Sequence, residues 1–391
     1  MVKNSFLEET WSEHCLGEFF EERKERAIGN EELLSVTIAN GVIRQSDSEK
    51  RNTSSEDKSN YKIVKKGDIA YNTMRMWQGA QGVSKWDGIV SPAYTIIKPK
   101  NGVNTEFFSI LFKTHHALTL FTNHSQGLSS DNWNLKFSEF SKLKIKVPSS
   151  EIQKKIVELM NAQDELLKNQ KEHLSRIINK RNAIVQRIFS RKIKYTASEN
   201  EWEYIELADI LTERKEKSDG TEEVYSVSVS KGLVNQIEHL GRSYAAENTS
   251  KYKVVYPGDV IYTKSPTGEF KWGIVKQSTI DKKVIISPLY GVFIPKNKFI
   301  GYLLDAYFSS SIRAHNYLIT QIRKGAKNTI NVSNDEFLAK GIFLPVDVEE
   351  QKALYELIFN LDLEIKNWTE KVERLQKVKL SLMQKIFEKL K

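Results

Sequence analysis

The chain has 391 residues, of which 28% are charged and 40% hydrophobic, and its formal net charge is +9. This composition excludes a disordered chain, allows two or more domains with cores of their own, and favours a polyanionic partner. The single cysteine, Cys15, excludes a disulfide framework or a cysteine-based zinc site and suits the reducing cytoplasm. We expect no signal peptide, because the N-terminal residues are acidic and lack an apolar core segment. We expect no membrane partner, because no uncharged stretch approaches the roughly 18 apolar residues of a spanning helix.

The first part of the chain, residues 1–150, is typical of a mixed α/β domain. Short β-rich runs are separated by Gly and Asn turn signals, and a proline ends the last of them. In chain order we expect strands over 33–38, 69–72 and 89–97, a helical patch over 107–121, and a last strand over 143–147.

Residues 151–198 have a different texture. They hold no proline or glycine up to residue 194, and their apolar residues recur about three and four positions apart. This spacing predicts one long helix with a coiled-coil seam. About 40 helical residues would form a rod of roughly 60 Å.

The second half of the chain repeats the first. An offset of 191 positions carries Trp11 onto Trp202 and residues 22–25 onto 213–216. The offset then rises to 198, which carries 186–189 onto 384–387. A period of this length indicates a duplicated domain rather than a solenoid. We therefore expect a second domain over 199–348 and a second long helix over 349–391.

The two long helices could each pack on their own domain or on each other. The second helix favours mutual packing, because its apolar positions alternate by threes and fours, with Lys379 as the one break. If a pseudo-twofold axis relates the halves, the helices run antiparallel and their length separates two similar domains. The apolar positions are Leu354, Ile358, Leu361, Ile365, Trp368, Val372, Leu375, Leu382 and Ile386.

The halves differ most in two loop stretches. The first runs from Tyr71 to Ser91 and has 19 intervening residues, whereas its counterpart from Tyr262 to Ser287 has 24. The second precedes the last strand of each domain. A shared frame around unlike loops is expected when loops carry recognition.

These loops are rich in side chains that read base edges and grip phosphates, although polar loops are often merely solvated. For the first domain we expect DNA contacts from Arg75, Trp77, Gln78, Gln126, Ser129, Asn132 and Trp133. For the second we expect them from Lys264, Thr267, Lys271, Arg323, Lys327 and Asn328.

The first long helix also carries seven cations and no acid after His173. Such a run can be a solvated face, follow a phosphate backbone, or meet an acidic partner subunit. The cations are Arg176, Lys180, Arg181, Arg187, Arg191, Lys192 and Lys194.

Signals for an enzyme are weak. The Ser-Pro-x-Tyr strings at 91–94 and 287–290 lack the second proline and the leading amide or carboxylate of amino-methyltransferase signatures, which favours a shared turn. Asp259 with Glu269 and Lys271 resembles a metal-dependent nuclease cluster, but the first half does not repeat it. The seven histidines show no metal-ligand spacing.

Taken together, the chain resembles the specificity subunit of type I restriction-modification systems over essentially its whole length. The resemblance lies in the order of domain, strand, proline and long helix, given twice. It lies also in the strings Ile152-Gln153-Lys154 and Glu350-Gln351-Lys352 at the helix starts, and in the Gln-Arg/Lys-Ile-Phe strings at the helix ends.

The resemblance implies a duplicated α/β (α+β) fold in which two target recognition domains are separated by an antiparallel coiled coil with pseudo-twofold symmetry. Each domain would read half of a bipartite, asymmetric site in double-stranded DNA. Two methylation subunits using S-adenosylmethionine would dock on this scaffold, and restriction-translocase subunits would bring ATP and Mg²⁺. The chain itself would hold no cofactor, metal or catalytic residue.

Two other classes of function stay open from the residues alone. One is a duplicated DNA methyltransferase or nuclease with its own active site. The other is a coiled-coil scaffold that does not bind DNA.

Overall fold

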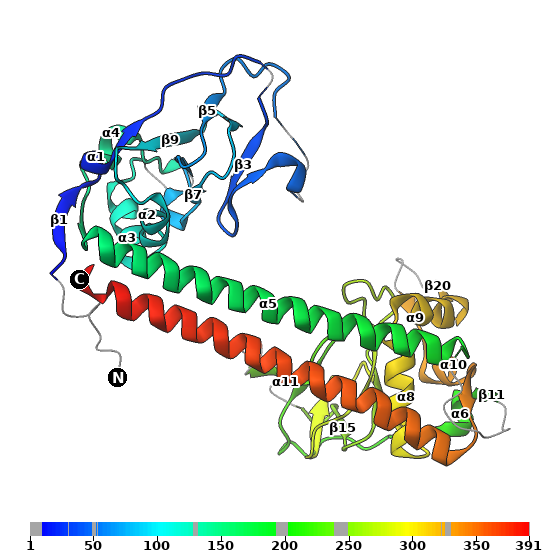
Figure 1. Ribbon diagram of the computed structural model, residues 1–391. Coiled ribbons are helices and arrows are strands. Elements are labelled where there is room, and N and C mark those ends of the chain that lie inside the picture. Colours follow the sequence, from blue (N-terminus) through cyan, green and yellow to red (C-terminus); the bar gives the residue numbers. More distant parts are fainter. Residues whose placement is uncertain are drawn as a thin grey trace. The chain divides into compact units, whose positions relative to one another are not determined.

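The computed structural model describes residues 10–29, 31–48, 52, 54–127, 132–192, 202–237, 249–321, 323–324 and 330–390. Of residues 323–324 and 330–331 it describes only the backbone. The chain forms two compact units. Figure 1 colours the chain by residue number, so the stretches of each unit can be found in it. The first unit comprises residues 1–171 and 370–391, and the second comprises residues 172–369. Each unit therefore takes part of its chain from both long helices.

In the described residues of the first unit, ten short strands are present, and all of their pairings are antiparallel. A four-stranded sheet has the order β2-β9-β6-β7, and three two-stranded pairs surround it, β1-β10, β3-β4 and β5-β8. The strands are β1 (Ser12–Cys15), β2 (Phe20–Glu22), β3 (Leu34–Thr37), β4 (Gly41–Arg44), β5 (Lys62–Val64), β6 (Ile69–Asn72), β7 (Gln81–Val83), β8 (Gly88–Val90), β9 (Tyr94–Pro99) and β10 (Lys144–Val147).

The second unit repeats every one of these pairings in the same chain order. Its four-stranded sheet has the order β12-β19-β16-β17, and its pairs are β11-β22, β13-β14 and β15-β18, with β20-β21 added. The duplicated α+β fold is thus confirmed. The strands are β11 (Trp202–Glu206), β12 (Leu211–Glu213), β13 (Tyr225–Ser228), β14 (Gly232–Asn235), β15 (Lys253–Val255), β16 (Val260–Tyr262), β17 (Val275–Gln277), β18 (Val284–Ile286), β19 (Gly291–Pro295), β20 (Arg323–Lys324), β21 (Ile330–Asn331) and β22 (Gly341–Pro345).

The helices also correspond between the repeats. The first has α1 (Leu16–Phe19), α2 (Thr105–Leu111), α3 (His115–His124), α4 (Phe137–Phe140) and the 3-10 helices η2 (Gln45–Asp47) and η3 (Met76–Gln78). The second has α6 (Leu207–Ile210), α8 (Lys298–Phe308), α9 (Ser311–Leu318), α10 (Asn334–Leu338) and η5 (Ile319–Gln321). The long helices are α5 (Ser150–Phe189) and α11 (Val348–Ile386), and η7 (Phe387–Leu390) follows the latter.

Two of the predicted elements are each divided in the structure. The predicted strand 89–97 is β8 and β9, which belong to different sheets, because Ser91-Pro92-Ala93 forms a turn closed by the Tyr94 N–H donating to the Ser91 carbonyl at 3.1 Å. The predicted helical patch is α2 and α3, because the Thr114 side chain accepts from the Ala117 N–H and begins a new helix.

The long helices pack on each other and on the globular parts as well. In the second unit, His173 and Trp368 have ring centroids 4.3 Å apart, and Arg181 lies opposite Asp362, so the helices run antiparallel. In the first unit, the start of α5 and the end of α11 enter one apolar core, where Ile156 is fully buried. Both predicted modes of packing are therefore present: the long helices pack on each other and on the globular parts.

The matched strings at the helix starts have a structural role. The Gln153 side-chain amide donates to the Pro148 carbonyl at 3.0 Å, and the Gln351 amide donates to the Pro345 carbonyl at 2.8 Å. Each glutamine thus binds the end of the preceding strand to the first turn of its helix. The bond gives the carbonyl at the end of each strand a hydrogen-bond donor.

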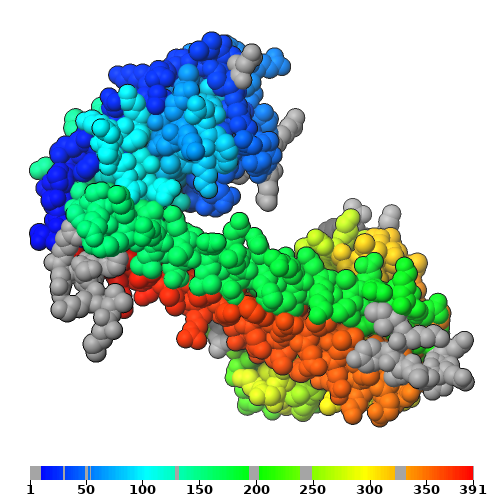
Figure 2. Space-filling view, in the orientation of Figure 1, coloured from blue at the N-terminus to red at the C-terminus, as the bar shows by residue number. Residues whose placement is uncertain are grey.

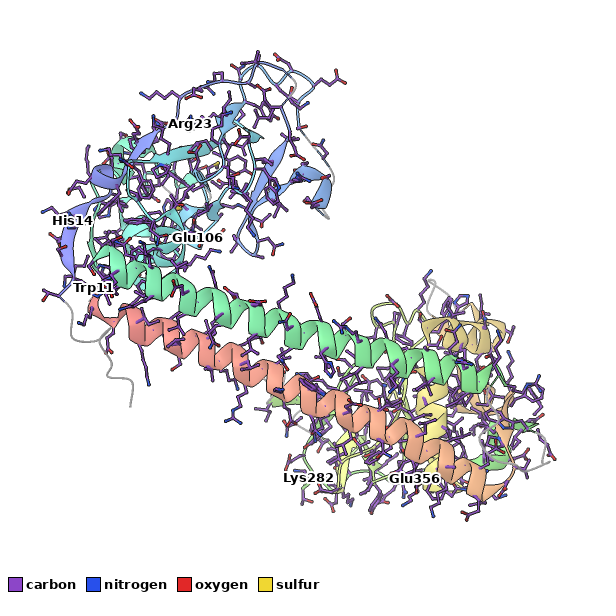
Figure 3. The ribbon with its side chains drawn as sticks, viewed as in Figure 1. Trp11, His14, Arg23, Glu106, Lys282 and Glu356 are labelled. Carbon is purple, nitrogen blue, oxygen red and sulfur yellow. The ribbon has the colours of Figure 1, made fainter. Side chains whose placement is uncertain are left out.

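The matched strings at the helix ends pack on the globular part of the opposite repeat. Trp11 of the first repeat packs on Phe387 after α11, with ring centroids 5.8 Å apart, and Figure 3 shows Trp11 beside that helix end. Trp202 of the second repeat packs on Phe189 of α5 at 6.0 Å. Figure 2 shows the start of α5 lying against the globular part of the first unit. Each globular part is thus completed by the far end of the other repeat's helix.

Candidate nucleic-acid interface

In the first repeat, a rigid loop carries three of the predicted DNA contacts. Arg75 and Gln78 are exposed, whereas Trp77 is half-buried. The Trp77 indole N–H donates to the Met74 carbonyl at 3.0 Å, and the Gln78 N–H donates to the Arg75 carbonyl at 3.0 Å. Gly79 ends η3 at φ +78°, a conformation that favours glycine. The two polar side chains therefore project from a fixed backbone.

The second divergent stretch of this repeat meets that loop. Trp133 and Trp77 form an edge-to-face pair with ring centroids 5.2 Å apart. The Leu135 N–H donates to the Thr73 carbonyl at 2.9 Å, and a backbone bridge joins Gln126 to Asn134. Gln126 and Asn132 are exposed, and Ser129 lies outside the described residues. The structure thus brings both predicted loops of the first repeat together.

In the second repeat, the equivalent loop is fixed by different contacts. The Trp272 indole N–H donates to His315 of α9 at 2.8 Å, and the Tyr262 hydroxyl donates to the Trp272 carbonyl at 2.7 Å. Thr267 and Phe270 exchange backbone hydrogen bonds of 2.9 and 3.0 Å. Lys271 is exposed at the end of this turn.

Lys264 is the most unusual residue of this loop. Its φ is +60°, which is uncommon for a residue with a side chain. Burial lowers the pKa of its ammonium group below the ordinary value. Strained backbone and a desolvated charge are features that concentrate at functional sites.

The structure leaves three predicted contacts of the second repeat without a description. Lys327 and Asn328 lie outside the described residues, and only the backbone of Arg323, in β20, is described. Their contact with DNA stays a prediction.

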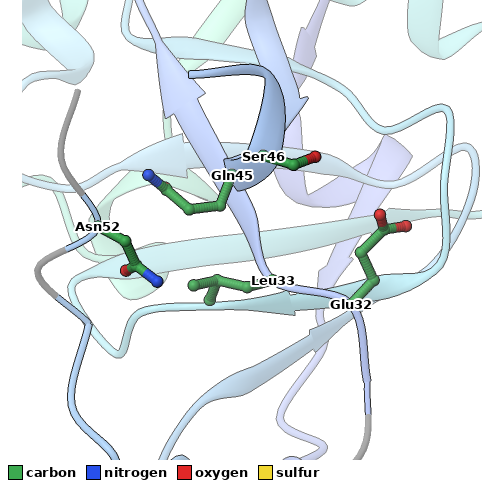
Figure 4. A pocket seen from close by; sticks show the side chains of 5 residues that line it. All are labelled: Glu32, Leu33, Gln45, Ser46 and Asn52. Carbon is green, nitrogen blue, oxygen red and sulfur yellow. The ribbon is translucent and has the colours of Figure 1, made fainter. Parts of the chain in front are cut away.

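A polar hollow beside the β3–β4 hairpin has no counterpart in the sequence predictions. It has a volume of about 360 Å³ and is lined by Glu32, Leu33, Gln45, Ser46 and Asn52. Figure 4 shows Leu33 between these polar side chains. Carboxamides such as those of Gln and Asn are the groups that read adenine. Gln45 matches Gln236 at the offset of 191, where the Gln236 amide donates to the Ser226 hydroxyl at 2.8 Å.

The run of cations on α5 is only partly open to a partner. Arg181 donates to both carboxylate oxygens of Asp362, at 2.9 and 3.2 Å, and to the Ser309 hydroxyl at 3.1 Å. Arg181 therefore joins the two long helices within the second unit instead of standing free for a partner. Arg191 lies over the Phe343 ring at 4.4 Å, and Lys194 is outside the described residues. The remaining exposed cations are Arg176, Lys180, Arg187 and Lys192.

Asp259 does not belong to a nuclease cluster. Arg214 donates to both of its oxygens, at 2.7 and 2.9 Å, and the Tyr256 N–H adds a bond of 2.8 Å. Arg23 and Asp68 form the same pair in the first repeat. Because both repeats bind the matched aspartate with the matched arginine, this ion pair has a structural role.

A serine, a histidine and a carboxylate do lie in series on β1 and α1, which the sequence pattern did not reveal. Ser12 Oγ is 2.8 Å from His14 Nε2, and His14 Nδ1 is 2.9 Å from Glu18. Figure 3 shows His14 at the surface. The nearby amides of Leu16 and Gly17 already donate to backbone carbonyls, so they do not form an oxyanion site.

Two further findings concern other kinds of site. Among the described residues, His, Cys, Asp and Glu side chains form no group of three or more that could hold a metal ion. In the same residues, no helix has the length and apolar character needed to cross a membrane.

The geometry defines a class of protein. Two similar α+β domains share one frame, down to matched ion pairs, and carry unlike polar loops on it. This is the arrangement of a duplicated α+β scaffold whose loops differ between the two copies.

Comparison with known proteins shows what the chain is similar to. Residues 8–177 match the family model of the type I restriction modification DNA specificity domain. No curated protein matches the chain in sequence.

Two solved structures resemble the chain over nearly its full length. The type-I restriction-modification system S subunit from M. genitalium has a TM-score of 0.60 and 12% identity, and the match covers 99% of this chain and 97% of that one. A chain from a study of complex assembly and conformational transition of the type I R-M system has a TM-score of 0.54 and 14% identity, with 96% and 97% covered. At these identities the likeness shows the fold. With the family match, it confirms the predicted resemblance to a type I specificity subunit.

Proposed function

We propose that the chain is the DNA sequence-specificity subunit of a type I restriction-modification complex and has no reaction centre of its own. The observation that carries the proposal is the specificity-domain match over residues 8–177, together with a second copy of the same strand pairings. Each copy would read one half of a bipartite site. Because the loops around Arg75 and Lys264 differ, the two halves would differ in sequence.

The partners follow from this role. Double-stranded DNA would lie against the loop clusters of both repeats, and the positive net charge would support binding to its phosphates. Two methylation subunits with S-adenosylmethionine, and restriction-translocase subunits with ATP and Mg²⁺, would supply the chemistry. The paired helices α5 and α11 would set the gap between the half-sites and offer a docking surface.

The proposal is tested by the methylated motif in DNA from cells that express the chain with its methylation subunit. Replacing residues 1–150 by the equivalent domain of a relative should change one half of that motif and leave the other half and the gap unchanged. Changes in both halves, or in neither, would contradict a modular reading of DNA.

The two alternative functions give different results. A self-sufficient enzyme predicts that the purified chain alone methylates or cuts DNA. A scaffold that does not bind DNA predicts that affinity for duplex DNA, with the methylation subunit present, shows no dependence on salt.

A further inference from the structure

Met74 is an exposed apolar side chain within the first repeat's polar loop. Its side chain is 44% exposed, between Thr73 and the exposed Arg75. A single exposed apolar residue is ordinary on a protein surface. The position of this one, however, is fixed from both sides.

The backbone at Met74 is held by two hydrogen bonds. Its N–H donates to the Asn72 side-chain oxygen at 3.0 Å, and its carbonyl accepts from the Trp77 indole at 3.0 Å. Trp77 in turn meets Trp133 edge to face, at an interplanar angle of 77°. Two large rings thus support the turn that carries Met74, and a rigid turn loses little conformational entropy when it binds.

The second repeat lacks this feature at the matched position. The offset of 191 places Ser265 there, and Trp272 is bound instead to His315. The apolar side chain therefore belongs to recognition by one repeat rather than to the shared frame.

We infer that Met74 is a wedge that enters a base step of the first half-site, held by the Trp77–Trp133 pair, while Arg75 and Gln78 contact phosphates or base edges beside it. Apolar side chains such as Met, Leu and Phe unstack the base step that they enter, and the bent duplex then covers more protein surface. This inference rests on the proposed function.

The test uses the chain in complex with its methylation subunits. The DNA is a set of duplexes of the methylated motif, each with 2-aminopurine at one position of the first half-site. This base fluoresces more strongly when it is unstacked. We expect one step of the first half-site to brighten on binding. Met74→Ala should lower that gain by about threefold or more, and Met74→Leu should keep it, because leucine also serves as a wedge. Ile28→Ala, which alters a more exposed apolar residue outside the loop, is the control and should change nothing.

The outcomes separate the two ideas. If the wild-type complex binds its motif specifically and Met74→Ala leaves the fluorescence of every position unchanged, the wedge is wrong and the proposed function stands. If the wild-type complex shows no sequence preference, the proposed function itself fails. A gain lost equally in Met74→Ala and Met74→Leu would also contradict an apolar wedge.

Discussion

At the scale of single residues, the duplication preserves ion pairs inside each domain. Arg23 Nε lies 2.7 Å from Asp68, and Arg214 Nε lies 2.7 Å from Asp259. Both carboxylates are 2% exposed. A charge that is buried this deeply is tolerated because it is paired and hydrogen-bonded. These residues are therefore part of the frame that both repeats share.

Removing one of these carboxylates should destabilise its own domain. Asp68→Ala leaves Arg23 without its bidentate partner and should lower the free energy of unfolding of the first unit by about 3 kcal/mol. Glu25→Ala removes the exposed partner of the same arginine and should cost less than about 1 kcal/mol. Chemical unfolding, with hydrogen exchange to assign the unit, measures both changes. Similar losses for the two variants would contradict the structural role of Asp68.

At Lys264, a substitution can remove the side-chain charge and keep the positive φ of the backbone, so the role of the charge in DNA binding can be tested by itself. Asparagine tolerates positive φ better than most residues, so Lys264→Asn should keep the turn and remove the ammonium group. We expect weaker DNA binding and a slope of log affinity against log salt that is smaller by about 0.9.

The matched control for this variant is Lys282→Asn, which removes a lysine that is paired with Glu223 at the surface. The control should retain the wild-type slope. An unchanged slope in Lys264→Asn would exclude contact between Lys264 and a phosphate.

The sequence predicted these residues unequally. The Arg23–Asp68 pair can be predicted from the sequence, because the duplication preserves both residues together. The pairing of Arg181 with Asp362 cannot be predicted, because the two residues are far apart in the chain and Arg181 stands among like charges in the helix sequence. Loop contacts such as Trp77–Trp133 have no repeat partner and therefore no signal in a comparison of the halves.

At the scale of elements, two ion pairs between the long helices are equivalents of one another. The offset of 198 carries Asp164 onto Asp362 and Arg181 onto Lys379. Lys379, the one break in the apolar pattern of α11, is paired with Asp164. Each unit thus has an ion pair at an equivalent position, which helps to fix the register of its stretch of the antiparallel helices.

The two equivalent pairs should contribute differently, because they are buried to different extents. Arg181 is 12% exposed, and Asp362 also accepts from the Tyr302 hydroxyl at 2.7 Å. Arg181→Ala leaves Asp362, which is 32% exposed, with the Tyr302 hydroxyl as a donor, and should destabilise the second unit by about 2 kcal/mol. Lys379→Ala leaves Asp164 in a position that is 56% exposed and should cost the first unit about 1 kcal/mol or less.

Unfolding of both variants, followed by hydrogen exchange in each unit, tests the difference. A larger loss in Lys379→Ala than in Arg181→Ala would show that burial does not decide the contribution of these pairs.

The order of the elements could be predicted from the sequence, since a pattern given twice supports each assignment twice. The boundaries inside continuous apolar runs could not. The β-rich run from 89 to 97 suggests one continuous strand in the sequence. In the structure, the hydrogen bond of the turn at Ser91 separates β8 from β9.

At the scale of the whole molecule, the division into compact units falls at 171/172 in α5 and at 369/370 in α11. These points lie midway between the equivalent ion pairs, at residues 164 and 181 of α5 and at 362 and 379 of α11. Each unit is therefore made of one repeat's globular part, the start of its own helix and the end of the other helix. The domain boundaries predicted from the sequence do not show this exchange, because a linear pattern assigns each helix to the domain before it.

Lengthening both helices at this division tests the proposal that they set the gap in the DNA site. Seven residues inserted after Gln170 and seven after Lys371 keep the apolar pattern and add about 10 Å of helix. We expect the gap in the methylated motif to grow by about three base pairs, since B-DNA rises about 3.4 Å per pair. Both half-sites should keep their sequence, because the loops of Arg75 and Lys264 are untouched.

An insertion in α5 alone is the control. It shifts Asp164 away from Lys379 or Arg181 away from Asp362, so it should weaken the helix pair and lower methylation instead of moving the gap. A gap that stays constant in the double insertion, with methylation intact, would mean that some contact other than helix length determines the spacing. That result would assign the spacing to the partner subunits, which would then have to hold the two recognition domains at a fixed separation on the DNA.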